Sequence, residues 1–287
     1  MCHSWWMVFL SRLSAVSHSI VRLAVPACLG LSLLTAPASV ASEDAVVPAQ
    51  DTFSLTARYS SRVLIFPVGD IVFEARLADT AYSASTRIEA AGLAALFTDF
   101  DINAEVQGYI EDTEASPRRY AHVERTGRKV RSVEVSFAEG VARSAVEPPF
   151  GSWGVPPASE DDRTGAIDPM SAFVALSEQL NRDEGRGCEG VLPVFDGKSR
   201  YNLRLENRGR DRIRTRGWRG EAVLCDIWYE PISGYDPEDY PSERELSQPL
   251  RIWLAPIDGG RYYLPVRLYT RAGLGGVTIE LAQVSAA

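Results

Sequence analysis

Arginine stands at every second position from Arg208 to Arg216. Asn207–Asp211 is expected to be a turn, and side chains on the following strand alternate between its two faces. One face then carries three arginines and a tryptophan: Arg212, Arg214, Arg216 and Trp218. Guanidinium groups in a row can hold a phosphate or carboxylate through forked hydrogen bonds. A solvated sheet face with acidic partners on a neighbouring strand explains the same spacing.

A second polar group surrounds Asp196-Gly197, between two segments with strand-like alternation. A type I′ hairpin turn explains this pair, because aspartate and glycine tolerate positive φ. Arg200 and Tyr201 follow, and alternation predicts that Tyr201 points inward and Arg200 outward. Both are candidate binding residues, although turn chemistry alone accounts for much of the segment.

Histidine is nearly absent, since residues 42–287 contain only His122. Zinc sites generally need several histidine or cysteine ligands, and no Gly-x-Ser-x-Gly motif supplies a nucleophilic serine. The glycines of 273–276 lie where a hairpin explains them better than phosphate binding does. We therefore predict no catalytic residue, no metal and no cofactor, and treat His122 as a packing residue.

Paired carboxylates are the remaining residues that could support an enzymatic reaction. Asp161-Asp162 and the group Asp236, Glu238 and Asp239 resemble the acids of glycoside hydrolysis or of calcium sites. Both groups lie in proline-rich loops, and neither has the alternating spacing of a calcium loop. Solvated loop acids are the simpler interpretation.

The N-terminal segment determines the expected compartment. Residues 1–41 contain two arginines and no acid, then an apolar run over 23–34 and small residues up to Ala41. This pattern is typical of an export signal. We expect cleavage after Ala41, with Ala38 as the second choice, and a periplasmic location.

Two alternatives to cleavage remain open. The leader could stay as an anchor, but the run 24–34 is far shorter than the roughly 20 residues that span a bilayer. Cys28 could instead be the acylated cysteine of a lipoprotein, but the strongest apolar stretch follows it.

Charge and cysteine content agree with export. The chain has 30 basic and 38 acidic residues, and without 1–41 it has 28 and 38, a net charge of −10. That balance argues against general nucleic-acid binding. Cys188 and Cys225 are the cysteines left after cleavage, and an even number in an oxidising compartment predicts a disulfide between them.

The rest of the chain predicts a mainly β fold. Apolar and polar residues alternate over 132–137 and 200–205, as in strands with one face buried. Short turn signals recur at 68–70, 125–127, 138–140, 196–197, 207–209 and 258–260. Strands joined by such short turns must be antiparallel. We expect a signal peptide over 1–41, a linker over 42–52 and one β-rich domain over 53–287, forming a curved sheet or half-barrel.

Two short helices interrupt this meander. Asp168 can cap a helix that starts at Pro169 and ends near Arg182. A shorter helix is expected over 90–97. The segment 147–167 is a loop rich in proline and acid, and it could divide the sheet into two halves. No segment after residue 41 is long and apolar enough to predict a transmembrane helix.

Several segments in this order resemble a bacterial exported family called domain of unknown function 3108. They are 168–172, Cys188, 192–203, Cys225, 229–235 and 265–267, and the resemblance covers roughly 53–281. The 195–201 stretch and the two cysteines are its most specific parts. The resemblance implies a periplasmic, sheet-rich protein without an assigned activity, similar to curved-sheet carriers of the cell envelope.

The sequence favours a non-enzymatic protein that binds an amphiphilic or anionic envelope ligand, or a partner, on the concave face of the sheet. The expected lining is apolar: Phe73, Leu77, Tyr82, Phe100, Trp153, Trp228 and Trp253. An enzyme that acts on envelope glycans through the loop acids, and a purely structural role in envelope assembly, are the alternatives.

Overall fold

The computed structural model describes residues 52–92, 94–96, 100–112, 114–182, 187–272 and 275–286. Both the expected signal peptide, with its cleavage site, and nearly all of the expected linker lie outside these residues. The described chain forms one antiparallel sheet with the strand order β7-β6-β5-β4-β3-β2-β1-β13-β12-β11-β10-β9-β8.

The strands are long and joined by short turns. Their bounds are β1 (Phe53–Val63), β2 (Phe66–Leu77), β3 (Ala81–Ala90), β4 (Phe100–Glu111), β5 (Glu114–Thr126), β6 (Lys129–Ala138), β7 (Val141–Glu147), β8 (Gly190–Phe195), β9 (Arg200–Arg214), β10 (Arg219–Ser233), β11 (Leu250–Ile257), β12 (Tyr262–Ala272) and β13 (Gly275–Ala286). The predicted antiparallel meander is confirmed.

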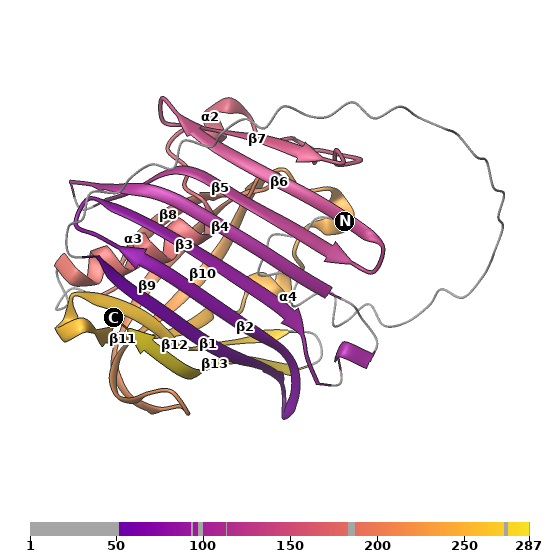
Figure 1. The fold of residues 1–287 in the computed structure, drawn as a ribbon. Coiled ribbons are helices and arrows are strands. Elements are labelled where there is room, and N and C mark those ends of the chain that lie inside the picture. Colours follow the sequence, from indigo (N-terminus) through magenta and orange to yellow (C-terminus); the bar gives the residue numbers. More distant parts are fainter. Residues whose placement is uncertain are drawn as a thin grey trace, which may run out of the picture.

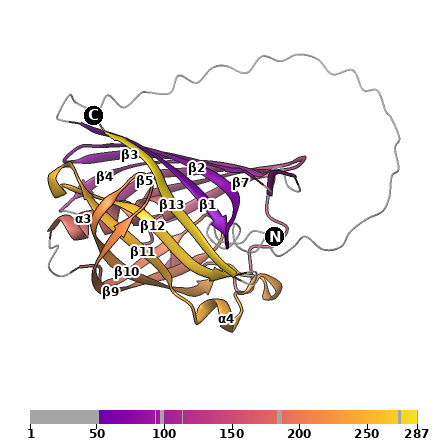
Figure 2. The same cartoon turned by 90° about the horizontal axis from the view of Figure 1, so that it is seen from below.

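The sheet bends into a nearly closed barrel. Strands β1–β7 form one layer and β8–β13 the other, as Figures 1 and 2 show from two directions. The two layers join where β1 pairs with β13. The sheet edges β7 and β8 are bridged by a short segment, in which Thr164 pairs with Val141 and Ile167 pairs with Val194. The loop expected to divide the sheet into halves therefore also links its two edges.

Five stretches of helix or 3-10 turn in the described residues lie between the halves of the sheet or in its later loops. They are α2 (Glu160–Arg163), α3 (Pro169–Arg182), η2 (Pro237–Asp239), α4 (Glu243–Leu246) and η3 (Asp258–Gly260). The helix predicted from Asp168 is thus confirmed as α3. Eight of its residues are buried, because α3 lies between the two layers of the sheet (Figure 1).

Three local predictions were wrong. Residues 68–70 lie inside β2, and the turn before that strand is at Leu64-Ile65. Residues 207–211 lie inside β9, where the pairing with β10 shifts register between Val223 and Cys225. Gly209 has φ +82° there, so a glycine that signals a turn in the sequence serves a β-bulge instead. The connection between Phe195 and Arg200 has four residues rather than a two-residue type I′ turn.

The described residues of the segment 90–97 do not form the single helix that the sequence predicted. β3 continues to Ala90, and a 3-10 turn, η1, covers Ala94–Leu96. Leu93 and Phe97, two of the residues that suggested this helix, lie outside the described residues. Gly92 has φ +58°, which lies outside the right-handed helical region, so the chain leaves β3 through a glycine turn and no continuous helix forms over this segment.

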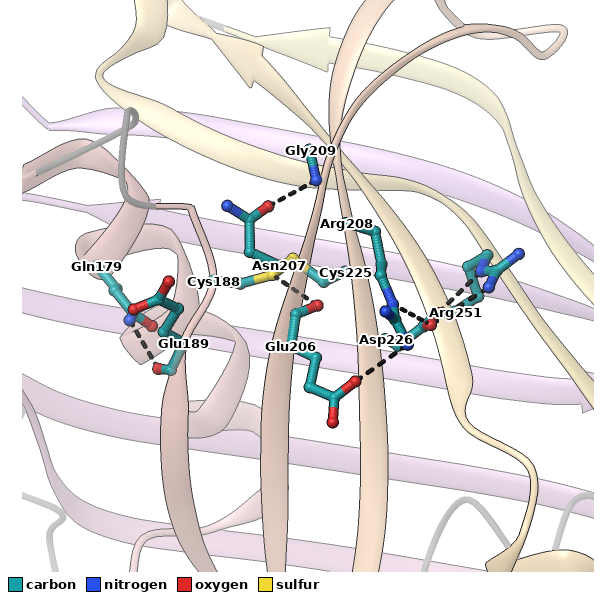
Figure 3. Close-up of a disulfide and its surroundings, with 10 residues drawn as sticks. All are labelled: Gln179, Cys188, Glu189, Glu206, Asn207, Arg208, Gly209, Cys225, Asp226 and Arg251. Atoms are coloured by element: carbon teal, nitrogen blue, oxygen red, sulfur yellow. Dashed lines mark hydrogen bonds and ion pairs between the residues drawn. A yellow bond between two sulfur atoms is a disulfide. The ribbon is translucent and has the colours of Figure 1, made fainter.

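The predicted disulfide is present between Cys188 and Cys225, whose Cα atoms are 6.1 Å apart. It ties the segment before β8 to the middle of β10, and both cysteines are fully buried. Figure 3 shows the bridge beside β9, with Arg208 and Arg251 both directed at Asp226. The bridge therefore fastens the edge of the sheet that would otherwise depend on β8–β9 pairing.

Asp226 lies at the centre of an ion-pair cluster on the outer face of β10. Its carboxylate accepts hydrogen bonds from Arg208 Nε at 2.7 Å and from Arg251 Nε at 2.8 Å. These bonds hold the pKa of Asp226 below its ordinary value, against the opposing effect of its burial. The first arginine of the ladder is therefore part of a structural charge cluster.

Candidate ligand-binding cavity

Helix α3 is fixed to the first layer of the sheet through its N-terminus. Asp168 Oδ1 accepts hydrogen bonds from the backbone N–H groups of Met170 and Ser171, both at 2.9 Å. The Ser171 hydroxyl also bonds to the hydroxyl of Tyr82 on β3, at 2.7 Å. Burial raises the pKa of Asp168 to about 6. The predicted capping residue thus holds Ser171, and Ser171 connects the helix to the sheet.

The same helix is fixed to the second layer further along. The backbone N–H of Tyr263 on β12 donates to Ser177 Oγ at 2.9 Å. Two anchors on opposite layers hold α3 across the interior, so it divides the space inside the sheet. Phe173 lies between these anchors and is half-buried.

Two apolar cavities flank α3, and both are lined by Pro169 and Phe173. The first has a volume of about 100 Å³ and lies against β9, β10 and α4, with Leu203 and Ile227 in its wall. The second has a volume of about 130 Å³ and lies against β1, β2, β3, β12 and β13. Its wall includes Tyr59, Ile71, Phe73, Ile88, Leu268 and Ile279. Phe173 is thus part of the partition between two apolar spaces.

Polar groups reach the first cavity at few places. Tyr201 and Tyr229 lie in its wall, with ring centroids 4.7 Å apart, and the Tyr229 hydroxyl bonds to that of Tyr235. Burial raises the pKa of Tyr201 well above its ordinary value, so its hydroxyl stays neutral. Arg271 and Glu245, which are both exposed, line the same cavity and place one cation and one anion at its edge. Such an arrangement suits an apolar chain with a polar end.

The Asp196 loop is structural. Asp196 Oδ1 accepts from the backbone N–H groups of Lys198 and Ser199 at 3.0 and 2.7 Å. Burial raises the pKa of Asp196 to about 6. Lys198 Nζ, whose side chain is 2% exposed, pairs with Asp236 at 2.8 Å. Gly234 packs against this loop so closely that a Cβ there would lie 2.2 Å from Lys198 O. The most specific motif of the sequence therefore joins β8, β9 and the end of β10.

Arg200 and Tyr201 point in opposite directions, as predicted. Tyr201 is buried at the first cavity. Arg200 Nε donates to Asp162 O at 2.8 Å, and its Nη1 donates to Asn202 Oδ1 at 2.8 Å. Arg200 thus secures the loop that closes the sheet and does not face the cavity.

The arginine ladder lies on an extension of the β9–β10 hairpin beyond β11. Trp253 Nε1 donates to Asp211 at 2.8 Å, Arg267 donates to Arg214 O at 3.2 Å, and Gly217 N donates to Leu281 O at 3.0 Å. These bonds fasten the extension to β11, β12 and β13. The side chains of Arg212, Arg214 and Arg216 are exposed there.

The expected single face of three arginines and Trp218 is broken by a turn. Thr215 N donates to Trp218 O at 2.8 Å, so Arg216 lies within the turn and Trp218 ends it. Trp218 is half-buried against the core. Strand alternation stops at Arg214, because β9 ends there. The arginines form an accessible surface that is separate from the two cavities.

The loop acids expected for an enzyme have structural partners. Asp162 forms the capping box of α2 with Ser159 and accepts from the Ser233 hydroxyl at 3.0 Å. Asp236 pairs with Lys198. Among the residues that the structure describes, no three His, Cys, Asp or Glu side chains form a group that could hold a metal.

His122 lies on β5 and is 7% exposed. Burial lowers its pKa to about 4, so the imidazole is neutral at physiological pH. Its ring lies 5.5 Å from that of Tyr120. This placement fits the packing role expected from the sequence.

The apolar lining was predicted in part. Phe73 lines the second cavity, and Tyr82 is buried beside α3. Trp228 and Trp253 are on the outer face, where Arg204 and Arg267 lie over their rings. Trp153 is 42% exposed in the loop after β7. Trp228 and Trp253 alternate with inward-facing residues of their strands. The position of a residue in this alternation, and not its aromatic side chain, therefore predicts whether it lines the interior.

Other cavity residues were missed, above all Phe173, Ile71 and Ile88. Ile71 and Phe73 alternate along β2 in step with the buried Ala75, and that period-two signal could have revealed Ile71. Nothing in the sequence indicates that α3 crosses the interior, because this depends on its anchors to β3 and β12.

Comparisons with known proteins agree with this fold. A family model described as "Protein of unknown function (DUF3108)" matches residues 52–282, so the chain belongs to that family. No curated protein matches the chain. Among solved structures, a similar one is a β-barrel-like protein of domain of unknown function DUF1849 from Brucella abortus. It has a TM-score of 0.50 and 10% identity, over 82% of this chain and 97% of that chain. That similarity supports the barrel-like fold alone.

Proposed function

We propose that this DUF3108 protein is a non-enzymatic, periplasmic binding or carrier protein for an amphiphile whose apolar tail enters the cavities beside α3. The observation that carries the proposal is the pair of apolar cavities that meet at Phe173. An apolar cavity of about 150 Å³ stays dry and binds small apolar molecules, and the second cavity here is close to that size at about 130 Å³.

The size of the cavities favours a slim tail. Pockets for drug-sized ligands usually measure about 300–1,000 Å³, whereas the two cavities measure about 100 and 130 Å³. Rotation of Phe173, which is half-buried, would join them into one longer channel. A hydrocarbon chain fits such a channel, while its polar end would remain near Arg271 at the edge.

Other features support a location outside the cytoplasm and a role without catalysis. A structural disulfide such as Cys188–Cys225 persists in oxidising compartments, in agreement with the expected export signal and its cleavage after Ala41. The loop acids Asp162 and Asp236 bond to neighbouring side chains. The glycan-acting enzyme therefore has less support than a binding protein.

The test is titration with cis-parinaric acid, a slim fatty acid that fluoresces in apolar surroundings. Ile88→Glu places a carboxylate in the wall of the second cavity, where an apolar tail cannot solvate it. We expect at least tenfold weaker binding than in the wild type, a loss of about 1.4 kcal/mol. Ile88→Trp, which fills the cavity without charge, should weaken binding as well.

Ile232→Glu is the matched control, because Ile232 is 46% exposed on β10. It should bind the probe as the wild type does, and circular dichroism should show all three variants folded. If Ile88→Glu and Ile88→Trp both fold and bind with wild-type affinity, the tail does not enter this cavity and the proposal is wrong.

A further inference from the structure

Most exposed apolar side chains lie at one end of the barrel. In an antiparallel sheet, the turns β1–β2, β5–β6 and β12–β13, the connection β10–β11 and the loop after β7 all lie at the same end. Of the ten large apolar side chains that are exposed in the described residues, eight belong to this end, and Tyr109 and Val191 are the exceptions. Single apolar residues scattered over a surface are normal, but such a one-sided distribution is typical of an interaction surface.

The most prominent of these residues form the tip between β1 and β2. Leu64 is 59% exposed, Ile65 is 79% exposed and Phe66 is 49% exposed. The tip is held in place, because Leu64 N donates to Gly276 O at 2.8 Å. Leu64 also packs on Gly275, where a Cβ would come within 2.7 Å of its side chain. The β1–β2 tip is thus an apolar projection supported by the neighbouring β12–β13 hairpin.

Other apolar residues at this end come from separate loops. Trp153 and Val155, in the loop after β7, are 42% and 71% exposed, and Tyr240 between β10 and β11 is 52% exposed. Val155 N donates to Tyr235 O at 2.8 Å, which holds these two loops together. Apolar groups spread over several loops suit a broad surface better than a single peptide groove.

Cations lie beside one of these exposed apolar side chains, because the β5–β6 turn carries exposed Arg128 and Lys129 next to Val130, which is 48% exposed. Apolar side chains flanked by cations suit the boundary of a membrane that contains anionic lipid. The two ends do not differ in the sign of their charge as a whole. The end with the exposed apolar residues also carries exposed acids in α4, and the opposite end carries the exposed arginines of the β9–β10 hairpin together with acids such as Asp79.

The first cavity reaches this same end. Its wall includes Leu246 of α4, Leu250 at the start of β11 and Arg271 near the end of β12. Helix α3 lies toward the other end of the barrel, and Figure 1 shows α3 and α4 on opposite sides. An apolar tail that leaves a bilayer at this end would therefore pass from the lipid directly into the first cavity.

We infer that this end of the barrel docks on a lipid bilayer, from which the amphiphile of the proposed function is taken or to which it is delivered. The inference rests on the proposed function for its ligand, but not for its surface. The β1–β2 tip inserts at the level of the lipid headgroups, and the opposite end of the barrel faces away from the membrane.

The test is sedimentation with vesicles of phosphatidylcholine and phosphatidylglycerol, using the mature chain. Ile65→Glu changes the most exposed apolar residue of the tip, and we expect at least tenfold weaker vesicle binding. The matched control is Val191→Glu, since Val191 is 49% exposed on the edge strand β8, and its vesicle binding should equal that of the wild type.

Titration with cis-parinaric acid separates the two proposals. Ile65→Glu should keep wild-type affinity for this probe while it loses vesicle binding. If the wild type binds the probe but not vesicles, the membrane inference is wrong and the proposed function stands. If the wild type binds vesicles but not the probe, the proposed function is wrong and the membrane inference stands. If Ile65→Glu instead abolishes self-association measured by analytical ultracentrifugation, the surface pairs with a second copy and the membrane inference is overturned.

Discussion

Replacing both Cys188 and Cys225 with alanine should lower the free energy of unfolding by about 4 kcal/mol in the chain-entropy model. The bridge closes a loop of 38 residues, counting both cysteines, and this loop contains β8, β9 and the first part of β10. In the unfolded chain the bridge restricts the ends of that loop, so its removal increases the entropy lost on folding. Denaturant unfolding of the two proteins measures the difference.

The reduced wild type is the matched control, because it keeps both side chains in the core. It should lose a similar amount of stability. Titration of the denatured, unreduced mature protein should find no free thiol. Two titratable thiols, or an alanine variant as stable as the wild type, would show that the bridge does not stabilise the fold.

Asp236→Ala should lower the free energy of unfolding by about 3–5 kcal/mol, the range for removing one partner of a buried ion pair. The change leaves the Lys198 ammonium group, whose side chain is 2% exposed, without the carboxylate that lies 2.8 Å away. Lys198 cannot reach water without disturbing the loop that joins β8, β9 and β10. Chemical denaturation at neutral pH measures this loss.

The double variant Lys198→Met/Asp236→Ala is the control, because it removes the buried charge together with its partner. It should recover much of the lost stability, since an apolar side chain of similar length replaces the ion pair. If the single and double variants are equally unstable, the charge of Lys198 is not the cause.

The pH dependence of the same pair provides a second check. Hydrogen bonds from Lys198 and Ser152 hold the pKa of Asp236 below its ordinary value. A carboxyl group of this kind contributes stability above its unfolded pKa of about 3.9 and loses it as the pH falls through its folded pKa. The difference between wild type and Asp236→Ala should therefore shrink in acid.

The fold was predictable because its signals are local. Period-two alternation and short turns predicted an antiparallel meander, and Asp168-Pro169 predicted the start of α3. Gly209 misled the turn assignment because glycine serves bulges and turns alike. The sequence resemblance also identified the family correctly, while leaving its activity open.

The candidate site was less predictable because it depends on contacts between distant segments. Tyr201 does lie at a cavity, but Arg200 turns toward Asp162, which is 38 positions away in the chain. Phe173 became part of the site only because Ser171 and Ser177 anchor α3 to opposite layers of the sheet. Local spacing contains no information about such long-range anchors.

The proposed docking on a bilayer does not use a membrane-spanning helix. Among the residues of the described ranges, no helix is long and apolar enough to cross a bilayer. The proposed docking instead uses loop residues such as Ile65 and Val155, which are exposed at one end of the barrel. A surface of this kind allows reversible contact, as a carrier requires.

The most direct test of the central claim is a crystal structure of the mature protein with a fatty acid brominated near the end of its tail. The anomalous signal of bromine locates the tail independently of any assay. We expect one strong peak beside Phe173, in the cavity bounded by Ile88 and Leu268. A peak only on the outer surface, or no peak at saturating fatty acid, would contradict it.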